Sequence, residues 1–204
     1  DNNLVREFYT QRRVVIRFDQ VPDVVIKATM AIEDNRFYDH FGIDPLRILK
    51  AFWVNVTTGS IAQGGSTLTQ QTAKNFLLSR DKKILRKIKE ILLALKIESQ
   101  FTKNQILELY LNRINYGHGN AGIEAAALSY FGKNVEELTL PEAALLAGIP
   151  QAPSRLAPTA SIKRATKKRN LVLTKMHDFG YITTAEMLRE QMTPIELKLN
   201  KEID

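Results

Sequence analysis

Helix-start signals recur along the whole chain and restrict it to a mostly helical fold. In a capping box, a threonine and a Gln or Glu three residues later bond each other's backbone N–H groups at the start of a helix. Asp44-Pro45 adds an N-cap residue followed by proline, which suits the first helical position. We therefore predict an all-α (mostly α) chain. Capping boxes stand at residues 67–70, 102–105, 139–142 and 183–186.

Apolar residues recur at helical spacing behind these starts. A helix opened by Pro22 and another over 161–179, closed by Gly180, each carry an apolar side. Residues 14–18, with the sequence Val-Val-Ile-Arg-Phe, are instead typical of a strand. Between residues 82 and 98 the apolar residues fall on a single stripe, at Ile84, Ile88, Ile91, Leu92 and Leu95.

The charge of the chain indicates an anionic partner. Lys and Arg number 29 against 22 Asp and Glu, which gives a net charge of +7. Nucleic acid, an acidic membrane surface and a phosphorylated substrate all fit that excess. The absence of cysteine excludes a thiol nucleophile and a zinc–thiolate site. The histidines stand far apart, at positions 40, 118 and 177, so we predict no dedicated metal site.

A first candidate site lies at the end of the helix that Pro22 opens. Glu33 and Asp34 are adjacent acids behind an apolar run, and a carboxylate beside buried surface tends to have a raised pKa that suits a general base. Glu33, Phe37 and His40 also share one face if the helix continues. Taken alone, the same segment fits acids that solvate a helix end and a histidine that caps or packs.

A second candidate site begins at Gly64-Gly65. A diglycine loop before a helix offers free backbone N–H groups and a favourable dipole for an anion. Thr67, Gln71 and Lys74 then form a polar ridge at helical spacing. The segment predicts a phosphate or pyrophosphate site, but not an ATP-binding P-loop, because no Gly-Lys-Ser/Thr follows. An exposed polar helix face explains the same spacing equally well.

A third cluster supplies a second acid and further cations. Arg86 and Glu90 lie one helical turn apart, which alone indicates an ion pair on a solvated face, and Lys87 lies beside Arg86. Sugar transfer at an anomeric centre uses two carboxylates, which Glu33 and Glu90 provide. Lys74, Arg86 and Lys87 suit a pyrophosphate leaving group, whose charge needs stabilising in the transition state. Together the three clusters favour a phospho-sugar transferase over a hydrolase.

Two further patterns carry less weight. Ser79-Arg80-Asp81-Lys82 matches the Ser-x-x-Lys motif of penicillin-binding enzymes, but its usual partner motifs are absent, so we interpret it as chance. The basic run from Lys163 to Arg169 has an apolar side, which is typical of a solvated helix face.

Five ordered segments resemble the motifs of the family 51 glycosyltransferases, the peptidoglycan polymerase domain of class A penicillin-binding proteins and of monofunctional transglycosylases. The resemblance extends from about Val21 to Leu173. Because all five occur in the family's order, the match is specific. The segments run from Glu33 to Gly42, from Gly64 to Asn75, from Arg86 to Glu90, from Leu109 to Gly132 and from Glu142 to Pro153.

The resemblance assigns roles to the candidate residues. It implies that Glu33 is the general base that deprotonates the acceptor sugar, and that Glu90 is the second acid, beside the pyrophosphate. The last two motifs look structural and would shape the wall of the cleft. Of the other residues, Asp34, Phe37 and His40 would support the base, Thr67, Gln71, Lys74 and Asn75 would line the donor side, and Lys74, Arg86 and Lys87 would hold the pyrophosphate.

The resemblance also implies a fold and a reaction. The family fold is lysozyme-like and helical, with a smaller membrane-associated lobe. Here the whole chain, 1–204, would form the glycosyltransferase domain, and the apolar residues around 45–62 would form its lobe. The reaction polymerises lipid II into β-1,4-linked glycan strands with inversion and releases polyprenyl pyrophosphate. No cofactor is required, and Mg²⁺ or Mn²⁺ would act only as a stimulatory ion.

The implied partners are lipid II, the lipid-linked glycan strand and the membrane surface, with moenomycin as inhibitor and no nucleic acid. The expected location is the extracytoplasmic, periplasmic face of the cytoplasmic (inner) membrane, with a transpeptidase domain in the full-length protein. Two other functions stay open at the level of sequence. A lytic or hydrolytic enzyme on the same scaffold would not need the cations. A non-enzymatic basic module would bind through residues 163–169 with a steep dependence on salt.

Overall fold

The chain is built from helices. The structure is a computed structural model, and it describes residues 14–58, 64–76 and 83–198. Within those ranges there is no strand, which confirms the prediction of an all-α fold. Residues 59–62 of the predicted lobe and the Ser79–Lys82 motif lie outside them. The α-helices are α1 (Asp23–Glu33), α2 (Pro45–Thr58), α3 (Leu68–Phe76), α4 (Lys83–Gln100), α5 (Lys103–Arg113), α6 (Ile123–Phe131), α7 (Leu140–Gly148), α8 (Pro153–Leu156), α9 (Ile162–Asp178) and α10 (Thr184–Met192), and the 3₁₀ turns are η1 (Phe18–Gln20), η2 (Val135–Glu137) and η3 (Ile149–Gln151).

Hydrogen bonds confirm the predicted helix starts. The backbone N–H of Thr67 donates to Gln70 Oε1 at 3.0 Å, and that of Gln70 donates to Thr67 Oγ1 at 3.1 Å. Asp44 Oδ1 accepts from the backbone N–H of Arg47 at 3.1 Å at the start of α2. These bonds satisfy N–H groups that a helix start leaves without partners. Capping boxes also close the starts at Thr102, Thr139 and Thr183.

The strand predicted at residues 14–18 is wrong. Residues 14–17 form no regular element, and η1 begins at Phe18. The backbone of Ile16 is bonded to a side chain of α5 instead: its N–H donates to Asn112 Oδ1 at 2.9 Å, and Asn112 Nδ2 donates to its carbonyl at 2.8 Å. A side-chain amide offers the same donor and acceptor as a neighbouring strand. The apolar segment therefore reaches the core without a sheet.

We expect Asn112→Ala to lower the free energy of unfolding by about 1–3 kcal/mol, because both backbone groups of Ile16 lose their partner. Asn104→Ala on the same helix serves as the control, because it removes only an exposed hydrogen bond from the Tyr38 hydroxyl, and its effect should be smaller, at about 0.5 kcal/mol. Urea unfolding measures both variants. Equal stabilities for the two would show that Asn112 does not hold the N-terminal segment.

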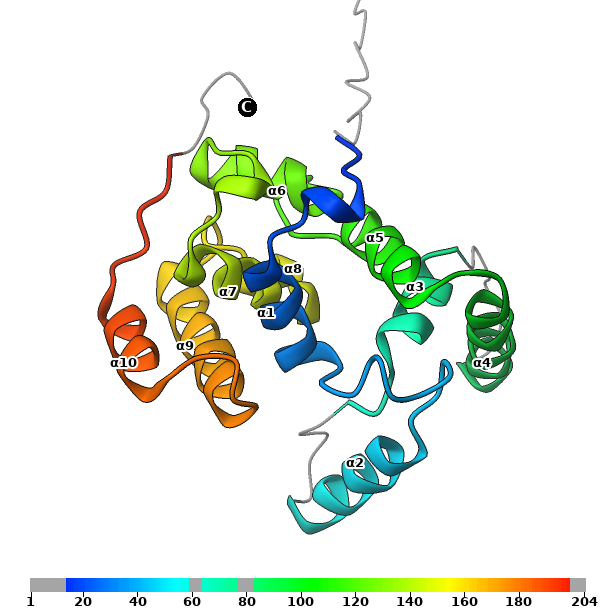
Figure 1. Ribbon diagram of the computed structural model, residues 1–204. Helices are drawn as coiled ribbons and strands as arrows, with labels where there is room; N and C mark the ends of the chain where they lie inside the picture. The colour runs from blue at the N-terminus through cyan, green and yellow to red at the C-terminus, as the bar shows by residue number, and fades with distance from the viewer. Residues whose placement is uncertain (1–13, 59–63, 77–82, 199–204) are drawn as a thin grey trace, which may run out of the picture.

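The core has two halves, and the candidate site lies where they meet (Figure 1). In one half α1, α7 and α9 pack against one another; in the other α3 packs against α4 and α5. Small residues let α1 and α7 approach closely, since Ala28 and Ala31 share a buried cluster with Ala144 and Ala147. The end of α1 reaches the start of α3 through Asp34, which follows the helix directly.

Apolar residues on α4 point away from the core. The stripe predicted at 84–95 lies on the outer side of the helix, with Ile84 exposed by 77% and Leu92 by 63%. The other side carries Glu90, Ala94 and Ile97, all buried. A solvated ion pair, the alternative that the spacing of Arg86 and Glu90 alone left open, therefore does not describe the buried Glu90. The exposed apolar stripe indicates that α4 forms part of an interaction surface. The buried acid on its other side indicates that the same helix also contributes to the candidate site.

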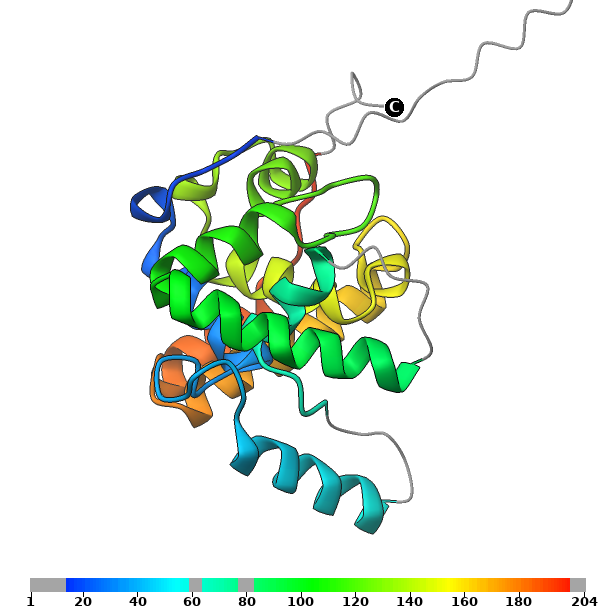
Figure 2. The ribbon, with the colours of Figure 1, turned by 90° about the vertical axis from the view of Figure 1, so that its right-hand side faces the viewer.

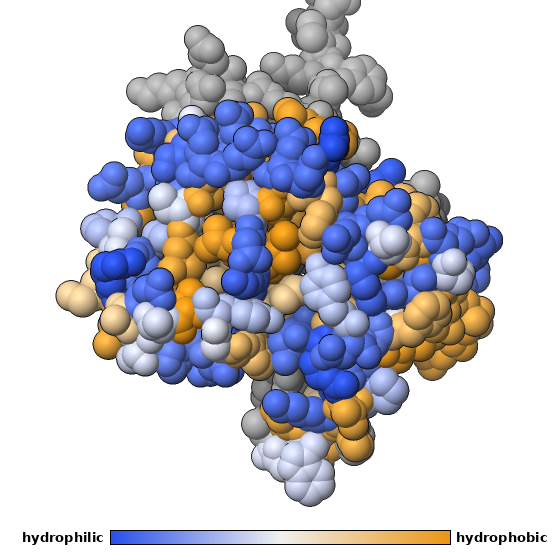
Figure 3. All heavy atoms as spheres, viewed as in Figure 1, coloured by the Kyte–Doolittle hydropathy of each residue, from blue (hydrophilic) through white to orange (hydrophobic). Residues whose placement is uncertain are grey.

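Helix α2 projects from the rest of the molecule (Figures 1 and 2). Its Leu49 and Trp53 are exposed by 65% and 69%. Figure 3 shows apolar side chains at the surface over both α2 and α4. Among the described residues, no helix is long and apolar enough to cross a membrane. The membrane-facing role of the lobe around 45–62 stays a prediction.

The basic run at 163–169 lies on α9. Lys163, Arg164 and Lys167 are exposed, as predicted for a solvated helix face. Arg169 is the exception, because it is only 1% exposed and its guanidinium donates to the backbone carbonyls of Gln191 and Thr193. It holds the segment that follows α10 against α9.

Candidate active site

Glu33 is the last residue of α1 and lies almost buried, with 5% of its surface exposed. Gln71 of α3 donates from Nε2 to Glu33 Oε2 at 2.7 Å. The other carboxylate oxygen, Oε1, has no hydrogen-bond partner among the described residues. A direct hydrogen bond thus joins the first candidate cluster to the second. It leaves one carboxylate oxygen able to accept a proton.

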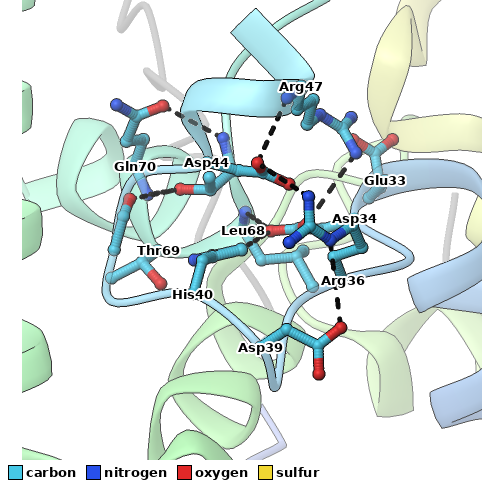
Figure 4. A network of polar contacts seen from close by, with 12 residues as sticks. Glu33, Asp34, Arg36, Asp39, His40, Asp44, Arg47, Leu68, Thr69 and Gln70 are labelled. Atoms are coloured by element: carbon cyan, nitrogen blue, oxygen red, sulfur yellow. Dashed lines mark hydrogen bonds and ion pairs between the residues drawn. The ribbon is translucent and has the colours of Figure 1, made fainter.

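Asp34 holds three segments together behind Glu33 (Figure 4). Its Oδ2 accepts the backbone N–H of Leu68 at 2.9 Å and lies 2.9 Å from His40 Nε2. Its Oδ1 lies 3.8 Å from an Arg47 guanidinium nitrogen of α2. Through these three contacts the fully buried Asp34 connects the loop after α1, the start of α3 and the start of α2. His40 and Asp34 therefore lie bonded to each other beside Glu33, and their supporting role in the reaction stays a prediction.

Two predicted substrate-binding residues lie under the site. Phe37 is fully buried in the core, and Thr67 is fully buried with its hydroxyl donating to the carbonyl of Gly42 at 2.7 Å. Neither has a surface to present to a substrate in this arrangement. They position the loop that carries His40 and the start of α3. In contrast, Lys74 and Asn75 are exposed on the last turn of α3.

A buried polar network that sequence reasoning missed supports the same loop. Thr69 donates to Glu98 Oε1 at 2.6 Å, and Lys103 Nζ lies 2.7 Å from the same oxygen. Lys103 also donates to the carbonyl of His40 and lies 4.7 Å from the centre of the Phe37 ring. No spacing in the sequence links these residues, since they come from three helices and a loop.

Glu90 lies among the predicted cations on α4. It is 6% exposed, and its Oε2 lies 3.1 Å from Lys87 Nζ while its Oε1 lies 3.7 Å from Arg86 Nε. Lys87 also donates to Ser66 Oγ, just before α3, at 3.0 Å. The carboxylate therefore pairs with both cations, and Lys87 also reaches the residues just before α3. Arg86 and Lys87 remain about two-fifths exposed, with values of 40% and 43%, so an incoming anion can reach them.

The charge of Glu33 acts on three groups outside the predicted set. Burial, and next to it the negative charge of Glu33, raises the pKa of Tyr110 and of Tyr116. Burial lowers the pKa of Lys168 on α9, and the charge of Glu33 opposes that change. Lys168 Nζ donates to Gln151 Oε1 at 2.6 Å. Both halves of the core thus contribute groups near Glu33.

The site offers no obvious metal centre. In the parts of the chain that the structure describes, no group of three or more His, Asp or Glu residues could hold a metal ion. The expectation that no cofactor is required, with Mg²⁺ or Mn²⁺ only stimulatory, stays a prediction.

Comparison with known proteins establishes the class that this fold and site define. The family model described as Transglycosylase matches residues 1–177, and the chain belongs to this family, the family 51 glycosyltransferases. The chain is 47% identical over 195 residues to penicillin-binding protein 1A of Vibrio cholerae serotype O1, covering 96% of this chain and 24% of the relative. It is 50% identical over 188 residues to penicillin-binding protein 1A of Aquifex aeolicus, covering 92% and 26%.

A solved structure supports the same assignment. The crystal structure of penicillin-binding protein 1A from Haemophilus influenzae matches with a TM-score of 0.58 and 29% sequence identity, over 94% of this chain and 19% of that one. The chain therefore spans about a quarter or less of the length of the relatives it matches.

Proposed function

We propose that this chain polymerises lipid II into β-1,4-linked glycan strands with inversion and releases polyprenyl pyrophosphate. The observation that carries the proposal is the bonded pair of Glu33 and Gln71, which joins a buried carboxylate at the end of α1 to α3, the helix that also carries Lys74. Glu90 pairs with Arg86 and Lys87, and Lys87 also bonds Ser66 just before that helix. This transfer requires a carboxylate that accepts a proton and cations that stabilise the leaving pyrophosphate.

In the proposed reaction, the 4-hydroxyl of the acceptor sugar gives its proton to Glu33 Oε1. The hydroxyl oxygen attacks the anomeric carbon of the donor strand from the side opposite to the pyrophosphate. The bond between that carbon and the phosphate oxygen breaks, and polyprenyl pyrophosphate leaves with the electron pair. Lys74, Arg86 and Lys87 stabilise its charge, and Glu90 keeps the latter two in place.

A labelled lipid II assay tests this function. The chain is incubated with lipid II in detergent, the products are separated by size, and the polymer is treated with a muramidase. We expect long, muramidase-sensitive glycan, with moenomycin suppressing its formation. Cleavage of pre-made glycan without any polymerisation would identify a hydrolase and overturn the proposal.

The lipid-linked substrate places the chain at a membrane surface. We propose that the exposed apolar residues of α2 and α4 contact the extracytoplasmic face of the cytoplasmic membrane, where lipid II is used. We also propose a transpeptidase domain in the full-length protein, because its relatives in Vibrio cholerae and Aquifex aeolicus are penicillin-binding proteins.

The double variant Leu49→Ser/Trp53→Ser is expected to weaken binding to phospholipid vesicles by about 10-fold or more, because two exposed apolar side chains on α2 are lost. Leu188→Ser/Met192→Ser removes two exposed apolar residues of α10, a helix that lies apart from α2 in Figure 1, and should leave binding unchanged. Vesicle sedimentation measures both. Equal losses in the two double variants would contradict a membrane-facing α2.

A further inference from the structure

A buried ion pair joins the end of α4 to the start of α5. Lys103 Nζ lies 2.7 Å from Glu98 Oε1, and only 19% and 3% of the two side chains are exposed. Taking two charges out of water can cost as much as their attraction returns, so a buried pair is weak evidence for stability. It does fix geometry, because each buried charge needs partners at defined positions. The Glu98–Lys103 pair is therefore a candidate for a positioning role.

Glu98 connects the pair to α3, the helix predicted to line the donor side. Thr69 of this helix donates to Glu98 Oε1 at 2.6 Å. Two residues further along the same helix, Gln71 donates to Glu33 Oε2 at 2.7 Å. The other carboxylate oxygen of Glu33 has no hydrogen-bond partner among the described residues. The direction of the Glu33 carboxylate thus depends on where α3 places Gln71.

Lys103 connects the pair to the loop that follows Glu33. It donates to the carbonyl of His40 and lies 4.7 Å from the centre of the Phe37 ring. His40 Nε2 in turn lies 2.9 Å from Oδ2 of Asp34, the residue next to Glu33. Asp34 Oδ1 has no hydrogen-bond partner among the described residues, so Oδ2 makes the hydrogen bonds that place this side chain. The position of the loop on Lys103 therefore affects the residue beside the proposed base.

The same loop lies directly against α4 at Gly42. A Cβ atom at this position would lie 3.1 Å from Glu98 Cγ and 3.3 Å from the carbonyl carbon of Ala94. Gly42 has a φ of +76°, which L side chains rarely adopt. Its carbonyl accepts from the Thr67 hydroxyl at 2.7 Å, just before α3. The loop therefore fits closely between α4 and the start of α3, and a change at the Glu98–Lys103 pair is transmitted to it.

We propose that Lys103 is a positioning residue of the polymerase. Paired with Glu98, it holds the loop after α1 in register with α3, and the Glu33 carboxylate then stays aimed at the acceptor hydroxyl. The inference rests on the proposed function and concerns two residues outside the sites predicted from the sequence. Lys103 acts on the reaction through these contacts. A displacement of about 1 Å in a catalytic group can cost about 100-fold in rate.

The double variant Glu98→Gln/Lys103→Met tests this role, because it removes both charges together and leaves no buried charge without a partner. The glutamine oxygen can still accept from Thr69, and the methionine keeps an apolar stem beside Phe37. We expect thermal stability close to native, a kcat for lipid II polymerisation lower by about 10- to 100-fold, and an unchanged KM. Lys103→Met alone should show the same loss of kcat with a lower stability, because it leaves the Glu98 charge unpaired.

Lys133→Met is the matched control. Lys133 Nζ lies 2.8 Å from Glu142 Oε1 in a second part-buried ion pair, whose side chains are 31% and 17% exposed. Loss of this lysine should lower thermal stability and keep the native kcat. An equal fall of kcat in Lys133→Met would overturn the role of Lys103, because a general loss of stability would then be the cause.

Hydrogen exchange gives a readout that does not depend on activity. The backbone N–H of Leu68 donates to Asp34 Oδ2 at 2.9 Å, so its exchange rate reports on the placement of Asp34. We expect Glu98→Gln/Lys103→Met to speed the exchange of this amide by about 10-fold or more, because the loop is released locally. The amide of Leu173, in the core of α9, should keep its native rate.

The outcomes separate this inference from the proposed function. Polymer from the native chain with an unchanged kcat in Glu98→Gln/Lys103→Met overturns the role of Lys103 alone, as does a rise in KM without a fall in kcat. Native exchange at Leu68 in the double variant overturns it as well. A native chain that makes no polymer from lipid II overturns the proposed function, and the exchange of Leu68 then still decides whether Lys103 holds the loop.

Discussion

Replacing Glu33 by glutamine is expected to reduce glycan polymerisation by about 10²- to 10⁴-fold, the usual contribution of a general base. In the native chain Gln71 Nε2 donates to Glu33 Oε2 at 2.7 Å. The substitution keeps the size of the side chain and a carbonyl oxygen that can still accept this hydrogen bond. It removes the oxygen that would take the proton. The loss should therefore appear in kcat, with lipid II binding and thermal stability close to native.

Glu136→Gln is the control for this prediction. Glu136 is an exposed glutamate in η2, remote in the fold from the end of α1, and its replacement should leave the rate unchanged. Initial rates of lipid II consumption at saturating substrate measure both variants. A Glu33→Gln enzyme that keeps more than about a tenth of native activity would exclude Glu33 as the base.

Lys74→Ala is expected to lower kcat by about 10²- to 10³-fold, because the transition state loses a charge aimed at the leaving pyrophosphate. Lys74 is exposed on the last turn of α3, and in the described ranges no carboxylate pairs with it. Its charge is thus available to a substrate. Lys87 is partly neutralised by Glu90 at 3.1 Å, so Lys87→Ala should have a smaller effect.

Lys163→Ala tests whether charge alone explains such a loss. Lys163 is an exposed lysine in the basic run of α9, and we expect its removal to leave kcat unchanged. If Lys74→Ala and Lys163→Ala behave alike, Lys74 contributes only to the general attraction of an anionic substrate. A rise in KM without a fall in kcat for Lys74→Ala would lead to the same conclusion.

The helix starts could be predicted from the sequence because their determinants are local. A capping box needs only two side chains three residues apart, and Thr67 with Gln70 forms the predicted pair of bonds. The segment at 14–18 failed for the opposite reason. Its strand-like composition is a local feature, but its hydrogen-bond partner is Asn112, far along the chain. No pattern in the sequence predicts that contact.

The orientation of α4 could not be derived from periodicity. A stripe of apolar residues looks the same whether it faces a core or a lipid surface. Only the structure shows that Ile84 and Leu92 are exposed and that Glu90 is buried.

In the candidate site, too, the individual residues could be predicted from local motifs, whereas the contacts between them could not. Glu33 and Gln71 were selected from separate motifs, and the structure joins them by a hydrogen bond. The buried network of Thr69, Glu98 and Lys103 could not be selected, because its members come from three different helices and only the structure brings them together. The roles of the predicted substrate-binding residues stay predictions until a substrate is bound.

The proposed polymerase activity is tested most directly by counting two products of the same reaction. Lipid II is supplied to the native chain, and the polyprenyl pyrophosphate released is measured against the new glycosidic bonds, whose configuration is read by NMR. We expect one polyprenyl pyrophosphate for each new glycosidic bond, and every bond should be β-1,4. The Glu33→Gln variant should form neither product at a comparable rate. New reducing sugar ends without release of polyprenyl pyrophosphate would contradict the proposed activity, because the chain would then cleave glycan rather than build it.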